Sequence, residues 1–189
     1  DPFYVKMGSI SDFSLGNGLI VDNYSNMRFL PQRRVFGMQL GIDGSLFGFP
    51  YVGLEVLTGN VSKFDVIGGR IYVRPLAFME ESLFGRLQLA ATGVLDRDPL
   101  LYTGTPYLAQ QTRLIYVVGA DITLPLIQSP AFSLTPFGEG AYEMNKAMGA
   151  IADIRGRAFG LVSYRAQFRY LQDGFIPSYF DANYDIYRA

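Results

Sequence analysis

Hydrophobic and polar residues alternate along most of the chain, with the period of two that is typical of β-strands with one apolar face. In the segment 34–43, Phe36, Met38, Leu40 and Ile42 fall on one face, opposite glycine, glutamine and aspartate. The same division returns in the segments 51–57, 67–74, 86–92, 114–124, 148–155 and 162–170, and less regularly in 132–143. An N-terminal strand near Phe3–Ile10 and a last strand near Asn183–Arg188 bring the expected total to about eight to ten.

Turn sequences separate these segments where hairpins require them. Asp43-Gly44, Arg155-Gly156 and Asp173-Gly174 are typical of tight connections between antiparallel strands. Helix signals are nearly absent, apart from one turn expected within 77–84. No composition shift marks a domain boundary, so we predict a single all-β domain over residues 1–189, built as an antiparallel up-and-down sheet.

The polar face of these strands decides between two kinds of barrel. An apolar face lines the interior of a soluble barrel but the exterior of a membrane barrel, and the period of two is the same in both. Here the polar face combines glycine with arginine, whereas a water-exposed strand face is typically richer in Lys, Glu and Thr. Because glycine beside long arginines suits a crowded lumen, we predict a transmembrane β-barrel, with a soluble ligand-binding β-barrel as an alternative.

The amino-acid composition excludes several kinds of catalytic and metal-binding site. The 189 residues include no His and no Cys, which excludes a Ser-His-Asp triad, a cysteine nucleophile, a zinc finger and disulfides. We therefore expect no enzyme, no cofactor and no metal. The formal net charge of -1 offers no basic field for nucleic acid. The longest apolar stretch, Leu114–Ala120, is far shorter than the roughly 18 residues of a membrane-spanning helix.

Two short motifs have ordinary explanations. Asp96 and Asp98 have the spacing of calcium ligands in a loop, but Pro99 follows at once and no further acidic residue completes an EF-hand, so we expect a solvated turn. The sequence Gly16-Asn17-Gly18 has no third glycine and no helix after it, so it predicts a turn and not a dinucleotide site.

Segments near both ends of the chain resemble a known class of protein. The stretches 8–20 and 23–26, followed far along the chain by 174–177 and 179–181, are similar to segments of Gram-negative and spirochaete-type outer-membrane β-barrels. The resemblance lies in the general residue pattern over the whole chain and not in a diagnostic motif. It implies a porin-like protein of the bacterial outer membrane that contacts outer-membrane lipid and lets small polar or ionic solutes pass. The chain lacks the aromatic residue that usually ends the last strand of such barrels.

Candidate site residues follow from the two strand faces. We expect the arginines and carboxylates of the polar face to form the charged constriction of a pore: Arg70, Arg74, Arg86, Arg165 and Arg169, opposed by Asp43, Glu55 and Asp121. The alternative is a structural or assembly barrel in which the same side chains fill a plugged lumen by pairing. We expect the following residues to face lipid: Phe36, Met38, Leu40, Val118, Tyr164 and Phe168.

Two further expectations concern the ends of the barrel. The stretch Ser9–Arg34 favours an ordinary strand pair with a long loop, and the alternative is a segment that folds inward and narrows the lumen. In lipid every strand edge must find a partner. Because the segment Asn183–Arg188 alternates poorly, we predict that residues 1–189 do not close alone, and that further strands of the same protein or another chain complete the barrel.

Overall fold

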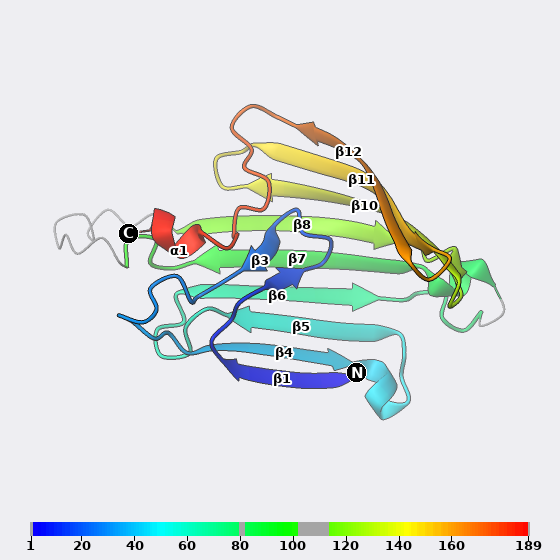
Figure 1. The fold of residues 1–189 in the computed structure, drawn as a ribbon, viewed down its shortest axis with the longest axis horizontal. Helices are drawn as coiled ribbons and strands as arrows, with labels where there is room; N and C mark the ends of the chain where they lie inside the picture. The colour runs from blue at the N-terminus through cyan, green and yellow to red at the C-terminus, as the bar shows by residue number, and fades with distance from the viewer. Residues whose placement is uncertain (1, 80–81, 102–113, 189) are drawn as a thin grey trace.

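One antiparallel sheet dominates the computed structural model, which describes residues 2–79, 82–101 and 114–188 (Figure 1). This confirms the predicted all-β, up-and-down fold. Nine strands lie side by side in chain order: β1 (Phe3–Gly8), β4 (Gly37–Asp43), β5 (Val52–Thr58), β6 (Val66–Val73), β7 (Gln88–Asp96), β8 (Ile115–Thr123), β10 (Phe132–Glu143), β11 (Met148–Ala158) and β12 (Val162–Leu171). A short strand, β9 (Ile127–Gln128), pairs with β10 on the flank that β8 also occupies.

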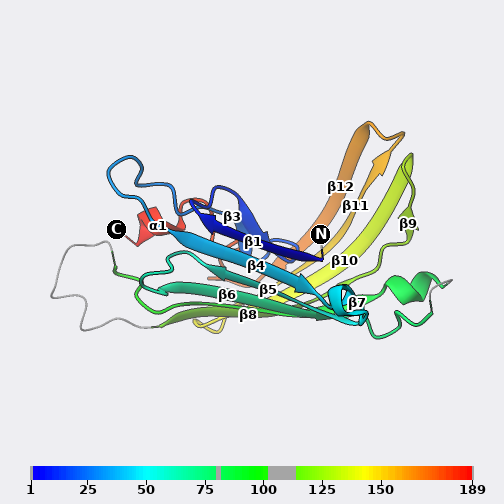
Figure 2. The same ribbon diagram turned by 90° about the horizontal axis from the view of Figure 1, so that it is seen from below.

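The register of the strands separates the two faces as the alternation predicts. Glu55 lies opposite Arg70, and Arg70 lies opposite Thr92, so polar residues of β5, β6 and β7 share one face. Leu54, Ile71 and Ala91 likewise lie in line on the other face. The sheet is strongly curved (Figure 2). We call the polar face the concave face and the apolar face the convex face.

The region between β1 and β4 folds onto the concave face. Its strands β2 (Phe13–Leu15) and β3 (Val21–Tyr24) form a separate two-stranded sheet, here called the inner hairpin. Figure 2 shows the inner hairpin on the side toward which β10–β12 curve. The stretch Ser9–Arg34 thus contains a strand pair, as expected, but this pair forms a separate sheet on the concave face and is not part of the main sheet. The two strands pair with each other and not with the main sheet, and Ile10, Leu15 and Tyr24 bury their side chains beneath the hairpin.

The C-terminal segment, residues 172–188, packs beside the inner hairpin. The Ser178 amide donates to the Leu19 carbonyl at 2.7 Å, and the Phe180 amide donates to the Ile20 carbonyl at 3.1 Å. The segment ends in a short helix, α1 (Tyr184–Tyr187). The strand expected over Asn183–Arg188 is therefore wrong. Two short 3-10 helices, η1 (Gly44–Phe47) and η2 (Leu83–Arg86), connect strands at the opposite end of the sheet.

The hydrophobic core lies between the concave face and the two segments that cover it. The hairpin and the C-terminal segment contribute Leu15, Ile20, Phe175 and Phe180, and the sheet contributes Leu57, Val66, Val94, Val117 and Ile151. Apolar side chains of the concave face therefore serve to hold these covering segments. The convex face has no covering layer among the described residues (Figures 1 and 2).

The outer strands β1 and β12 lie at opposite margins of the sheet (Figure 1). Within the described ranges, no backbone pairing joins them. Each strand therefore presents one edge of unpaired backbone groups along the sheet.

Candidate functional site

The centre of the concave face holds a buried ion pair. A guanidinium nitrogen of Arg70 lies 2.9 Å from a carboxylate oxygen of Asp121, and both side chains are almost fully buried. Glu55, directly across from Arg70 in the register, is 3.6 Å from another nitrogen of the same guanidinium. Three of the predicted site residues, which come from β5, β6 and β8, therefore form one cluster.

The inner hairpin lies directly over this central cluster. A Cβ atom added at Gly16 would lie 3.1 Å from the Nε of Arg70. The amide of Leu19 faces the buried carboxylate of Glu139 at 3.4 Å. Glu139 lies opposite Asp121 in the register of β10 and β8. The turn thus packs closely on Arg70 and Asp121, which explains why the sequence has a glycine at position 16.

A second cluster lies where β4 and β6 meet the end of the sheet. Arg74 donates to the Asp43 carboxylate at 2.8 Å, and the hydroxyl of Tyr72 donates to the same oxygen, also at 2.8 Å. Arg74 also donates to the carbonyl of Pro50. The cluster therefore ties the β4–β5 connection to the end of β6.

A third group lines the concave face of β11 and β12. Arg165 pairs with Asp153, whose carboxylate also accepts from the amide of Gln167 at 2.9 Å. Arg169 donates to the side-chain oxygen of Gln167. Arg155 stacks over the Phe137 ring at 4.7 Å from its centroid and donates to Asn17 of the inner hairpin at 3.0 Å.

With one exception, the residues predicted to form one charged constriction are thus divided among the three groups described above. Arg86 joins none of them, because it belongs to η2 ahead of β7 and is exposed there. The predicted set of site residues leaves out Glu139, Asp153 and Arg155. Pro136 and two glycines obscured the alternation around Glu139. The other two have the same period-two spacing as the predicted residues, and that signal was sufficient to find them.

A fourth polar cluster fixes the C-terminal helix to the ends of β6 and β7. The Arg188 guanidinium lies 2.7 Å from Asp65, 3.1 Å from Asp96 and 3.0 Å from Asp185, all of them buried. The Tyr184 hydroxyl donates to Asp96 at 2.8 Å. Burial raises the pKa of the Asp185 carboxyl to about 6, although the Arg188 guanidinium opposes this shift. Asp96 is therefore buried in an ion-pair cluster, which corrects the expectation of a solvated turn.

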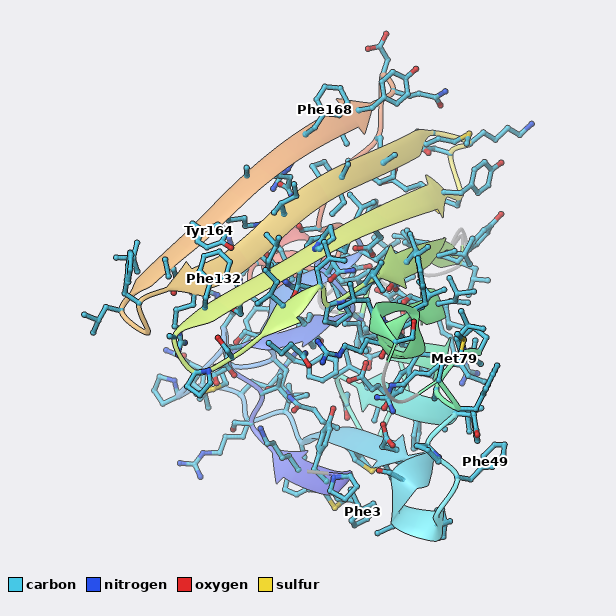
Figure 3. The ribbon with its side chains drawn as sticks, turned by 90° about the vertical axis from the view of Figure 1, so that its right-hand side faces the viewer. Phe3, Phe49, Met79, Phe132, Tyr164 and Phe168 are labelled. Atoms are coloured by element: carbon cyan, nitrogen blue, oxygen red, sulfur yellow. The ribbon has the colours of Figure 1, made fainter. Side chains whose placement is uncertain are left out.

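All six predicted lipid-facing residues lie on the convex face. Phe36, Val118 and Phe168 are exposed, the last with 71% of its surface free. Met38 and Leu40 are half-buried. Tyr164 is also half-buried, because its ring lies over Gly156 beside Phe132 and its hydroxyl donates to the Ser133 carbonyl at 2.7 Å. Figure 3 shows Phe3, Phe49 and Phe168 at the outer margins of the molecule.

Two features of other protein classes, a membrane-spanning helix and a metal-binding group, are absent from residues 2–79, 82–101 and 114–188. No helix there is long and apolar enough to cross a membrane. The same residues include no group of three or more His, Cys, Asp or Glu side chains arranged to hold a metal ion.

Comparisons with protein-family models, curated proteins and solved structures found no match to this chain. Its functional interpretation therefore depends on the two faces of the sheet.

Proposed function

We propose that this sheet is the wall of a β-barrel in a bacterial outer membrane, with a lumen that passes small polar or ionic solutes. The observation that carries the proposal is the exposed apolar surface of the convex face, opposite a concave face whose centre holds buried charges. Convex residues such as Ile71, Val118 and Ile122 are large, apolar and about half exposed, whereas Arg70 and Asp121 on the concave face are buried. A soluble barrel places its apolar side chains inside, so this distribution favours a lipid-facing exterior.

Strand length supports the same proposal. Strands β7 and β8 have 9 residues, β12 has 10 and β11 has 11. A tilted strand needs about 9–11 residues to cross the hydrocarbon core of a bilayer. These four strands therefore have the length that spanning requires.

Strand direction indicates how the wall closes. Nine antiparallel neighbours place β1 and β12 in the same direction, as their arrows show in Figure 1. Direct pairing of the two would be parallel, whereas single-chain bacterial barrels are antiparallel with an even number of strands. A second copy related by an axis along the membrane normal would also pair β1 with β12 in parallel. The proposed barrel therefore needs an odd number of additional strands, from the same protein or another chain.

Engineered cysteines test the closure, because residues 1–189 contain no cysteine. Val5→Cys on β1 is combined in turn with a cysteine at position 164, 166, 168 or 170 of β12, and each double variant is oxidised in native membranes. We expect no disulfide within the chain at any register. A rapid intrachain disulfide at one position would show that β1 and β12 pair directly.

Detergent dependence tests membrane insertion. We expect extraction from cells only with detergent, and β-type circular dichroism retained in the micelle. A monodisperse protein in buffer without detergent would contradict the proposal and favour a soluble ligand-binding barrel.

A structural barrel with a plugged lumen is the second candidate, and one observation favours it. The inner hairpin and the C-terminal segment cover the central cluster and bury Leu15 and Phe180 completely. Ion current across a planar bilayer separates the two candidates. Current through the wild-type protein supports transport. Current that arises only after Arg188→Met loosens the C-terminal segment supports the plugged barrel.

A further inference from the structure

One corner of the concave face carries three arginines, one of which, Arg165, pairs with an acid. Arg155, Arg157 and Arg165 line a hollow of about 570 Å3, together with Ser133, Thr135 and Ser163. Among the described residues that line this hollow, none is acidic. The acid that pairs with Arg165 is Asp153, and its carboxylate also accepts from Gln167.

The strand register in this corner differs from that around Arg70. Arg70 lies directly opposite Glu55, so opposite charges face each other in the centre. Arg155 instead lies directly opposite Arg165 on β12 and opposite Thr135 on β10. Like charges in directly opposed positions destabilise a strand pair. An anion held between these guanidinium groups would relieve that repulsion.

The serine and threonine hydroxyls of the hollow add further hydrogen-bond donors to the three guanidinium groups. Arg157 lies opposite Ser133 on one side and Ser163 on the other. Guanidinium groups bind carboxylate and phosphate oxygens with paired N–H donors, and hydroxyls add single donors. The corner therefore combines guanidinium groups, which are planar and positively charged, with neutral hydroxyl donors. Both kinds of group donate hydrogen bonds to the oxygens of an oxyanion.

Two of the guanidinium groups are already held in position. Arg155 is stacked on Phe137 and hydrogen-bonded to Asn17, and Arg165 is fixed by Asp153. Because these side chains are ordered before a ligand arrives, binding loses less conformational entropy. Arg155 also joins the wall to the tip of the inner hairpin, so the hollow adjoins the segment that covers the lumen.

We propose that this corner, here called the arginine corner, binds small multivalent oxyanions of the phosphate or polycarboxylate class. The proposal rests on the proposed function in one respect, since it names the solutes that the lumen would favour. A second, much smaller hollow of about 30 Å3 between the hairpin and the wall also includes Arg165, together with Arg169. Arg165 therefore lines both the open hollow and the narrow gap beside the hairpin, where Arg169 and the acidic Asp22 lie as well.

Calorimetric titration with inorganic pyrophosphate tests the binding site without requiring a conducting barrel. The full chain in detergent is titrated at low ionic strength, because salt screens exposed charges. We expect saturable binding that Arg155→Gln combined with Arg157→Gln weakens about tenfold or more, since two charge-assisted contacts are lost. The matched control combines Arg86→Gln with Arg97→Gln, which removes the same net charge from exposed positions outside the hollow.

Each outcome decides the proposal. Loss of affinity in the first double variant alone, with unchanged circular dichroism, supports the arginine corner. Absence of pyrophosphate binding in the wild type overturns it, and so does equal weakening in both double variants. Failure of the protein to insert into membranes would overturn the proposed function and leave this binding measurement valid.

Discussion

Glycines of the concave face mark the places where the covering segments touch the sheet. A Cβ atom at Gly68 would lie 3.1 Å from Leu15, and one at Gly119 would lie 2.9 Å from Ile20 of the inner hairpin. A Cβ atom at Gly149 would overlap the ring of Phe175. Glycine weakens a strand in isolation, but here its missing side chain provides the space that the hairpin and the C-terminal segment fill.

Substitution of Gly149 tests this explanation. Gly149→Ala should displace Phe175 and destabilise the docked C-terminal segment by about 1–3 kcal/mol, as overpacking does in other cores. Hydrogen exchange of peptides from the segment 172–180 measures the effect. Gly93→Ala is the control, because its Cβ would meet only Val118 at 3.9 Å. Equal exchange in the two variants would contradict the proposed packing role.

A charge on the convex face should be far more costly than one on the concave face. In a lipid bilayer, Val118→Arg should lower the free energy of unfolding by about 2–4 kcal/mol if position 118 lies near the midplane. Gln167→Arg is the matched control, because its side chain lies on the concave face next to Asp153. Denaturant titration of liposome-inserted protein measures both. A similar loss in the two variants would contradict the assigned faces.

At the scale of the element, period-two alternation predicted the long strands and both faces. It succeeded for β4–β8, β11 and β12 because each is long enough to repeat the pattern several times. It failed for the inner hairpin, whose short strands have apolar residues that are buried by distant parts of the chain. It also failed for α1, where contacts of Tyr184 and Arg188 with β6 and β7 outweigh local preference. Apart from Arg86, which lies in η2, the candidate residues were placed on the correct face, but their division into separate clusters depends on strand register.

The cluster around Arg188 determines how firmly the C-terminal segment is attached. Arg188→Met should destabilise its docking by about 3–5 kcal/mol, because removing the only cation of a buried ion-pair cluster leaves charges uncompensated. Asp185→Asn should have a much smaller effect, since Asp65 and Asp96 still pair with the guanidinium. Limited proteolysis of the segment 172–188 measures both variants. Comparable protection in the Met variant and the wild type would refute this role.

The same cluster predicts a pH dependence. The pKa of Asp185 is about 6 in the folded state, above the value of about 3.9 for an unfolded aspartate. The folded state therefore binds this proton more tightly, so docking of α1 should become more stable as the pH falls from 7 to 5. Hydrogen exchange, corrected for intrinsic rates, measures the change, and Asp185→Asn should remove it. Weaker docking at pH 5 in the wild type would contradict the prediction.

For the whole molecule, the arrangement is a curved sheet with an apolar outer surface and a polar inner surface that its own chain partly fills. Ion pairs, the inner hairpin and the C-terminal segment occupy the concave face, and the arginine corner lies on its β10–β12 part. Under the proposed function, the convex face contacts lipid, an odd number of further strands closes the wall, and solutes pass beside the hairpin.

Nitroxide labels attached to single engineered cysteines test the lipid-facing surface most directly. Labels at positions 116, 118, 120 and 122 of β8 would sample the convex face, and labels at 117, 119, 121 and 123 the concave face. In liposomes, we predict that the first set is accessible to oxygen dissolved in lipid and shielded from a water-soluble nickel complex. The second set should be poorly accessible to oxygen. Accessibility to the nickel complex throughout the first set would contradict the account.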